Sequence, residues 1–289
     1  MLNTKQKIYL AGLAHRVSSN LRSAFGKNGK ADVYRRGLRW ELDLSEGIDF
    51  SIYLLGAFEP GTAKTLASLI RPGDVVLDIG ANIGAHTLGI AKCVGGAGKV
   101  FAVEPTDFAF AKLLRNLSLN PEIESRVNAH QLFFSDGLVK SFPKEIYASW
   151  PLTSAAALHP KHLGRLVSTA NARFETLDSF VTSHQIARID LIKIDVDGHE
   201  VPVLRGGLRT LRRFRPALVM ELAPYIHKEN SNCFAELIGL LKTSGYSLQN
   251  ADNGKSVPLD TDRLEELIPD GGSMNVVARA KTELTDDRI

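Results

Sequence analysis

The sequence predicts an α/β fold with a doubly wound, mostly parallel sheet, because strand-like and helix-like patterns alternate along most of the chain. From about residue 74 onward, short apolar runs alternate with segments whose apolar residues recur at helical spacing. The candidate strands are 74–79, 99–103, 127–133, 189–195, 217–221, 245–249 and 274–280. The candidate helices are 83–93, 106–119, 199–213 and 231–244.

The composition is that of an ordinary soluble globular protein. The 289 residues are 44% hydrophobic and 23% charged, and this length fits one or two domains. The two cysteines, Cys93 and Cys233, argue against a disulfide framework and fit a reducing cytoplasm. No apolar run approaches ~18 residues, so we expect no transmembrane helix and a cytoplasmic location.

The N-terminal segment is basic and amphipathic. Residues 1–40 hold nine Lys or Arg side chains and a single acid, Asp32. A basic arm of this kind is either a solvated helix or a contact to an acidic surface such as the headgroups of a membrane. The segment has no convincing signal-peptide cleavage site. Its apolar residues at helical spacing are Ile8, Leu10, Leu13, Ala14, Val17 and Leu21.

Two segments differ from the alternating pattern. Within 30–60, the stretches 38–44 and 50–55 resemble strands of a hairpin, so we expect residues 1–60 to form a basic helix and a small β cap, and residues 61–289 the main domain. Residues 135–172 have a weak pattern and interrupt that domain, which is typical of a lid or a substrate-binding insertion.

The first chemical motif is Val75-Val-Leu-Asp-Ile-Gly-Ala-Asn-Ile-Gly84, which predicts a buried strand, a tight turn and the start of a helix. Gly80 and Gly84 let the backbone pass close to a ligand. Asn82 stands where a dinucleotide fingerprint has its middle glycine, so a pyrophosphate fits poorly.

Two acids specify the ligand further. Asp78, at the end of the first strand, suits a cation, whereas a phosphate would be repelled. Glu104, 26 residues later at the tip of the next strand, is placed to accept hydrogen bonds from ribose hydroxyls. A cationic nucleoside without a pyrophosphate indicates S-adenosylmethionine. A dinucleotide, or a strand–turn–helix without a ligand, are the alternatives.

The second motif is Ile189-Asp-Leu-Ile-Lys-Ile-Asp-Val-Asp-Gly-His-Glu200. Lys193, Asp195 and Asp197 alternate along the predicted strand and should point the same way. His199 opens the next helix beside these carboxylates, which suits a general base. Alternatively, this is a strand end in which Asp197 is the N-cap of the helix, with Glu200 three residues on.

A metal site is a further alternative, in which Asp195, Asp197 and Glu221 offer oxygen ligands to magnesium or calcium. Nothing in the spacing fixes a coordination geometry, so we expect no metal. The remaining histidines do not have a zinc-binding spacing and are expected on the surface or in loops: His130, His159, His162, His184 and His227.

With both motifs in view, the chain resembles the FkbM family of S-adenosylmethionine-dependent methyltransferases. The resemblance implies a Rossmann-like fold of the class I methyltransferase type and O-methylation of a hydroxyl on a sugar, polysaccharide or natural product. Asp197 stands where the family often has Glu, a small departure. The matching segments are 78–84, 102–105 with 117–120, 134–136, 175–178, 192–200 and 203–206.

The expected site residues follow from both lines of reasoning. His199, Asp195 and Lys193 are the candidate catalytic residues. An NAD-dependent sugar oxidoreductase and a non-catalytic cofactor- or glycan-binding module remain alternatives. No nucleic-acid-binding module is visible, so a nucleic-acid substrate is not expected. The candidate cofactor-binding residues are Asp78, Gly80, Ala81, Asn82, Gly84, Glu104, Pro105, Ser135, Asp136 and Asp195.

Overall fold

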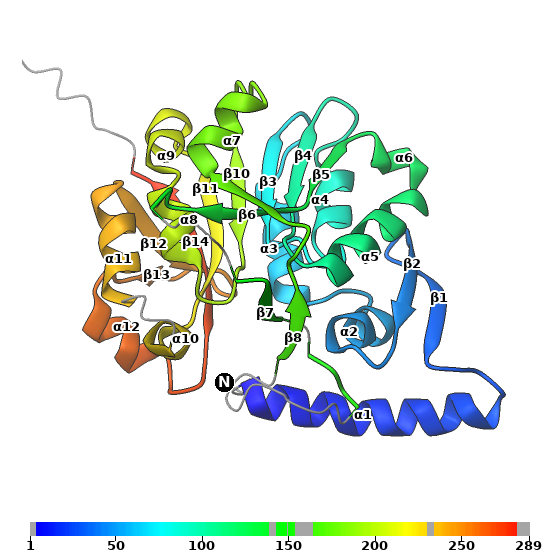
Figure 1. The fold of residues 1–289 in the computed structure, drawn as a ribbon. Helices are drawn as coiled ribbons and strands as arrows, with labels where there is room; N and C mark the ends of the chain where they lie inside the picture. Colours follow the sequence, from blue (N-terminus) through cyan, green and yellow to red (C-terminus); the bar gives the residue numbers. More distant parts are fainter. Residues whose placement is uncertain (1–3, 139–142, 149, 154–163, 230–233, 282–289) are drawn as a thin grey trace, which may run out of the picture.

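The computed structural model describes residues 4–138, 143–148, 150–153, 164–229 and 234–281. An eight-stranded sheet forms its centre, with helices on both faces (Figure 1). The strand order is β13-β12-β14-β11-β10-β3-β4-β5. The predicted α/β fold with a doubly wound, mostly parallel sheet is confirmed.

The five parallel strands of this sheet lie where the apolar runs predict them: β3 (Val75–Ile79), β4 (Lys99–Val103), β5 (Val127–His130), β10 (Leu191–Ile194) and β11 (Ala217–Leu222). Beyond β11, the sheet continues antiparallel with β14 (Met274–Ala280), β12 (Tyr246–Asn250) and β13 (Ser256–Val257). The chain leaves β3 toward β4 on one side and returns later to place β10 on the other. This reversal puts the ligand crevice at the carboxyl ends of β3 and β10.

Alternate residues of β3 enter two separate hydrophobic cores, as expected for a strand covered on both faces. Val76 packs in one core with α3 (Pro60–Leu69), α4 (Thr87–Cys93), α5 (Asp107–Ser118) and α6 (Pro121–Glu124). Leu77 packs in the other, which is built by α7 (Leu177–Ser183), α8 (Glu200–Arg205), α9 (Leu208–Phe214), α11 (Phe234–Thr243) and α12 (Thr261–Leu267). The short helix α10 (Pro224–Glu229) follows β11.

The N-terminal region contains α1 (Thr4–Ala24), a hairpin of β1 (Lys30–Arg35) and β2 (Leu38–Asp43), and α2 (Gly47–Leu55). The predicted strand at 38–44 is confirmed, but the predicted strand at 50–55 is wrong, because these residues belong to α2. The helix ends at Gly56, whose left-handed φ of 78° lets its N–H donate to the Ile52 carbonyl. That glycine was the local signal for a helix end.

Three other elements differ from the predicted ones. The candidate strand 127–133 divides, because the apolar run of β6 (Leu132–Ser135) leaves the main sheet and pairs with β9 (Arg173–Thr176). The candidate helix 83–93 begins only at Thr87. The candidate helix 199–213 breaks at Gly206, where the backbone passes so close to β6 that a Cβ would lie 2.0 Å from the Ser135 carbonyl oxygen.

The insertion at 135–172 contains an antiparallel hairpin of β7 (Glu145–Ala148) and β8 (Arg165–Ser168). It is joined to the start of α2, because Gly47 N–H donates to the Trp150 carbonyl at 2.8 Å and Arg165 forms an ion pair with Glu46 at 3.0 Å. His159 and His162 of this insertion, and residues 231–233 of the predicted helix 231–244, lie outside the described residues. None of the described helices is long and apolar enough to cross a bilayer.

Candidate active site

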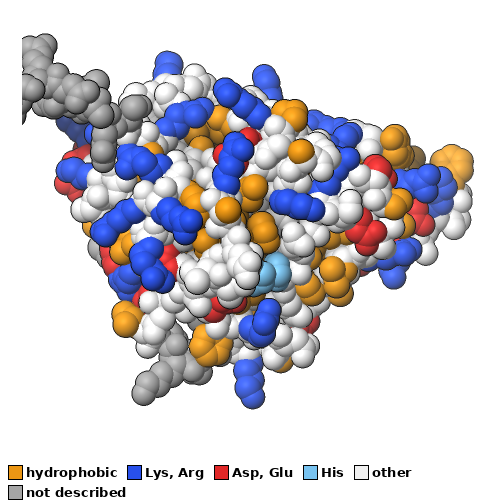
Figure 2. Space-filling model, turned by 90° about the horizontal axis from the view of Figure 1, so that it is seen from above, with side chains coloured by type: hydrophobic (Ala, Val, Ile, Leu, Met, Phe, Trp, Pro, Cys, Tyr) orange, Lys and Arg blue, Asp and Glu red, His pale blue; other side chains and the backbone are white. Residues whose placement is uncertain are grey.

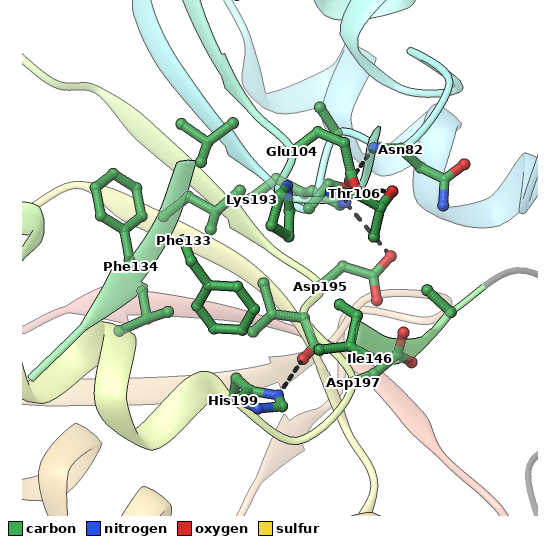
Figure 3. Close-up of a pocket in the computed structure, with 18 of the residues that line it drawn as sticks. Asn82, Glu104, Thr106, Phe133, Phe134, Ile146, Lys193, Asp195, Asp197 and His199 are labelled. Carbon is green, nitrogen blue, oxygen red and sulfur yellow. Dashed lines mark hydrogen bonds and ion pairs between the residues drawn. The ribbon is translucent and has the colours of Figure 1, made fainter. Parts of the chain in front are cut away.

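A pocket opens at the carboxyl ends of β3, β4 and β10, in the crevice that the strand order creates (Figure 3). Its walls come from the loops after these strands, from β6, and from the described part of the 135–172 insertion. Eight of the predicted site residues line it: Gly80, Ala81, Asn82, Glu104, Pro105, Lys193, Asp195 and His199.

Glu104 organises one end of the pocket (Figure 3). Its Oε2 accepts from Asn82 N–H at 2.9 Å, and its Oε1 accepts from the N–H of Thr106 at 2.9 Å and from the Thr106 hydroxyl at 2.5 Å. Burial raises the pKa of this carboxyl, and these three bonds act in the opposite direction. A carboxylate has about four acceptor sites, so one on Oε2 remains for a ligand hydroxyl.

The glycine turn and the β10 loop touch through their backbones. Gly80 has a φ of 79°, and a Cβ on it would lie 1.8 Å from the Asp195 carbonyl oxygen. The Gly80 carbonyl also accepts a 2.8 Å hydrogen bond from Lys193. Only glycine fits here, because the conformation is left-handed and there is no room for a side chain.

Lys193 forms the floor of the pocket. Its ammonium lies 3.4 Å from a carboxylate oxygen of Asp78 and 3.4 Å from one of Asp195, and the residue is 3% exposed. Burial disfavours the charged form, but the two carboxylates outweigh it and hold the pKa of Lys193 above its ordinary value. An ammonium held this way stays protonated near neutral pH, so it orients its neighbours and cannot serve as a base.

Asp78 supports this floor from behind. It is fully buried, does not line the pocket, and accepts a 2.6 Å hydrogen bond from the Thr87 hydroxyl. Asp195, whose side chain is 33% exposed, is therefore the carboxylate of the pair that faces the pocket.

The turn after β10 differs from the predicted strand end. The strand stops at Ile194, so the alternation of Lys193, Asp195 and Asp197 does not continue along it. Asp197 has a left-handed φ of 47°, and the predicted N-cap role of Asp197 is wrong, because His199 occupies that position. Burial and the neighbouring carboxylates of Asp195, Glu221 and Glu200 raise the pKa of Asp197.

The His199 ring has a defined orientation at the other end of the pocket (Figure 3). Its Nδ1 lies 3.2 Å from the Val196 carbonyl, and the ring packs edge-on against Phe133 at a centroid distance of 5.1 Å. A carbonyl only accepts, so Nδ1 carries the proton and donates it. In the neutral ring, the Nε2 atom then carries the lone pair that a general base requires.

His86 is a site residue that the sequence reasoning missed. It lines the pocket, is 5% exposed, and among the described residues neither ring nitrogen has a hydrogen-bond partner. Burial, and secondarily the nearby Lys193 charge, lowers the pKa of His86 to about 4, so the ring is neutral. Buried polar atoms normally have partners, which makes His86 a candidate ligand contact. Its position two residues after the first motif was the available signal.

Three predicted cofactor residues besides Asp78 do not line the pocket. Gly84 lies beyond it in the turn, and Ser135 is buried at the end of β6. Asp136, expected near the adenine, accepts from Arg205 at 2.8 Å and from Leu138 N–H at 2.9 Å instead.

The walls of the pocket are strongly aromatic, which the motifs did not indicate. Apart from the adjacent Phe133 and Phe134, the rings come from separate parts of the chain, so no local pattern connects them. They are Phe58, Phe133, Phe134, Tyr147 and Trp150. Within the described ranges, no group of three His, Cys, Asp or Glu residues is arranged to hold a metal ion, and this includes Asp195, Asp197 and Glu221.

Two known proteins have sequences that are similar to part of this chain. The chain is 27% identical over 154 residues to the hexuronic acid methyltransferase AglP of Haloferax volcanii, covering 53% of this chain and 58% of that protein. It is 30% identical over 99 residues to a tRNA(Phe) (4-demethylwyosine(37)-C(7)) aminocarboxypropyltransferase of Pyrococcus horikoshii, covering 33% of this chain and 31% of that protein. The chain thus spans less than two thirds of either relative.

Solved structures with a similar arrangement include a methyltransferase FkbM from Methylobacillus flagellatus, with a TM-score of 0.43 and 15% identity over 75% of this chain and 50% of that one. A SAM-dependent O-methyltransferase from Thermotoga maritima has a TM-score of 0.45 and 16% identity over 91% and 82% of the two chains. The model of the methyltransferase FkbM domain matches residues 78–248, which include both chemical motifs. The chain therefore belongs to the FkbM methyltransferase family, and its cofactor is S-adenosylmethionine.

Proposed function

We propose that this methyltransferase transfers the methyl group to a hydroxyl oxygen of a sugar-containing acceptor, with His199 as the general base. The observation that carries this proposal is the His199 ring, whose Nδ1–H donates to the Val196 carbonyl while Nε2 remains an acceptor at the pocket. Transfer to oxygen, unlike transfer to a strong nucleophile, requires that a hydroxyl proton be removed.

The residues of the pocket fit the cofactor. Glu104 has one acceptor site left for a ribose hydroxyl, and Asp195 offers a partly exposed carboxylate to a sulfonium charge. The apolar wall of β6, which includes Phe133 and Phe134, suits a nucleobase. The unpaired nitrogens of His86 offer one further polar contact.

S-adenosylmethionine supplies an electrophilic methyl group, which passes from sulfur to oxygen and leaves a neutral thioether. Holding the two reacting atoms in line accounts for most of the rate enhancement. His199 Nε2 takes the hydroxyl proton as the oxygen–carbon bond forms. Lys193 keeps Asp195 and the Gly80 carbonyl in place by its ion pair and hydrogen bond.

The acceptor is proposed to be a sugar because of two independent features. The relative AglP is described as a hexuronic acid methyltransferase. Tyr147 and Trp150 line the pocket, and their rings combine a broad apolar face with a polar edge. Such residues suit ligands that carry both apolar faces and hydroxyls.

The test uses S-adenosylmethionine with isotopic label either in the methyl group or in the carboxyl carbon. Incubated with hexuronic acid-containing glycans, the enzyme is expected to transfer only the methyl label, in a base-stable ether linkage. Transfer of the carboxyl label would instead indicate aminocarboxypropyl transfer, and label on carbon would contradict O-methylation.

The base is tested by His199→Ala, with His184→Ala at the C-cap of α7 as the matched control. The His199 variant should bind S-adenosylmethionine normally in calorimetry but lose roughly 10²–10⁴-fold in turnover, the usual contribution of a general base. Near-normal turnover by this variant would remove His199 from the mechanism.

A further inference from the structure

Helix α1 attaches to the protein through its small and polar side. Its His15 ring packs edge-on against Phe50 of α2 at a centroid distance of 5.3 Å, and Ala14 packs against the core that α2 helps to build. Near its end, Arg22 donates to the Asn28 and Lys30 carbonyls at 3.1 and 2.8 Å. These contacts determine which side of the helix faces solvent.

The apolar side of α1 faces solvent. Residues 10, 13, 17 and 21 recur at helical spacing and therefore form one stripe. A helix of a globular protein normally turns such a stripe toward the core. The large apolar residues exposed on and just after α1 are Tyr9 (68%), Leu10 (50%), Leu13 (42%), Val17 (61%), Leu21 (59%) and Phe25 (80%).

The helix that carries this stripe is basic. Helix α1 contains Lys5, Lys7, Arg16 and Arg22 and no acid, within a 40-residue segment that has nine basic residues and one acidic residue. An apolar stripe on a basic helix is complementary to a bilayer that carries anionic headgroups, because the headgroups attract the charges and the acyl boundary accepts the stripe.

The position of α1 relates it to the pocket. The helix lies below the sheet in Figure 1, on the side of the β7–β8 hairpin. It packs on α2, and Ile48 of α2 lines the pocket. Basic side chains also gather on the face opposite α1 (Figure 2), so charge alone does not select a docking face. The exposed apolar stripe distinguishes the α1 face as the docking face.

We propose that α1 docks this protein on an anionic lipid bilayer, with Leu10, Leu13, Val17 and Leu21 entering the headgroup boundary. In this arrangement the protein is bound to the membrane surface and does not span it. The pocket side of the molecule then faces the bilayer, which fits an acceptor that is itself carried by the membrane. The docking does not depend on the transfer chemistry.

The experiment is flotation of the full chain with vesicles of phosphatidylcholine containing about 30 mol% phosphatidylglycerol, compared with phosphatidylcholine alone. Wild type should float with the anionic vesicles, and added salt should weaken this binding because it screens the headgroup charge. The double variant Leu13→Asp, Val17→Asp should bind at least roughly tenfold more weakly, because the stripe is then polar.

Leu267→Asp is the matched control, since Leu267 is an apolar side chain of similar exposure (54%) on α12, in a different part of the molecule. Calorimetric binding of S-adenosylmethionine shows that each variant is folded. Unchanged flotation of the double variant, or no flotation of wild type, would overturn the proposal. So would a wild-type dimer in light scattering that the double variant dissociates, because the stripe would then be covered by a second copy.

Discussion

Replacing Lys193 by Met should destabilise the fold by about 3–5 kcal/mol, the usual cost of removing one partner from a buried ion pair. The cost arises mainly at Asp78, which is fully buried and, among the residues that the structure describes, would keep only its hydrogen bond from Thr87. Asp195 contributes less because its side chain is 33% exposed and can be hydrated. The loss of the 2.8 Å bond to the Gly80 carbonyl adds to the total.

The assay is urea-induced unfolding of wild type, Lys193→Met, Asp78→Asn and the double variant, without cofactor. The double variant should be more stable than the sum of the single changes predicts, since the unpaired charge is then gone. Lys64→Met, at an exposed position on α3, is the control and should change the free energy of unfolding by less than about 0.5 kcal/mol. A Lys193→Met protein of wild-type stability that has lost turnover would refute the reasoning and make Lys193 a catalytic group.

Three further predictions concern two other residues of the pocket and one residue of the fold. The pKa of His86 is 6.5 in the unfolded chain and about 4 in the folded protein, so the unfolded chain takes up the proton at a higher pH. The free energy of unfolding should therefore fall by on the order of 3 kcal/mol as the pH falls from about 6.5 toward 4. His86→Gln should reduce this loss in urea titrations at several pH values, and parallel pH profiles would contradict the assignment. Glu104→Ala should weaken S-adenosylmethionine binding by ~1.5–3 kcal/mol in calorimetry, and an unchanged affinity would place the ribose elsewhere. Asn116→Leu should destabilise the fold by on the order of 2–4 kcal/mol, because the buried Asn116 accepts from Glu41 N–H and donates to the Ile83 carbonyl, and a change below about 0.5 kcal/mol would show that this link is not needed.

The strands of the main sheet were predictable because each is a short apolar run whose burial on both faces is visible locally. Residues 99–103 and 274–280 form strands with the predicted bounds. The elements that differ depend on contacts with distant residues. For example, β6 leaves the main sheet to pair with β9, some forty residues later in the chain.

The same distinction applies to the site. Glu104, Asp195 and His199 follow strand ends, and the parallel topology brings strand ends together, so their meeting in one pocket was predictable. Trp150 reaches the pocket only because backbone bonds join its insertion to α2, and no local pattern encodes such a contact. Asp136 follows a strand end too, but β6 lies outside the main sheet and Arg205 engages its carboxylate.

The backbone contact between Gly80 and Asp195 makes two sequence motifs, more than a hundred residues apart, a single mechanical unit. A side chain at Gly80 would displace the Asp195 backbone, and with it the turn that carries His199. The position of the proposed base is therefore coupled to the shape of the glycine turn, through this backbone contact and through the Lys193 hydrogen bond to the Gly80 carbonyl. Transfer of one motif alone into a related enzyme should fail, and transfer of both together should succeed, because the backbone of each motif limits the space available to the other.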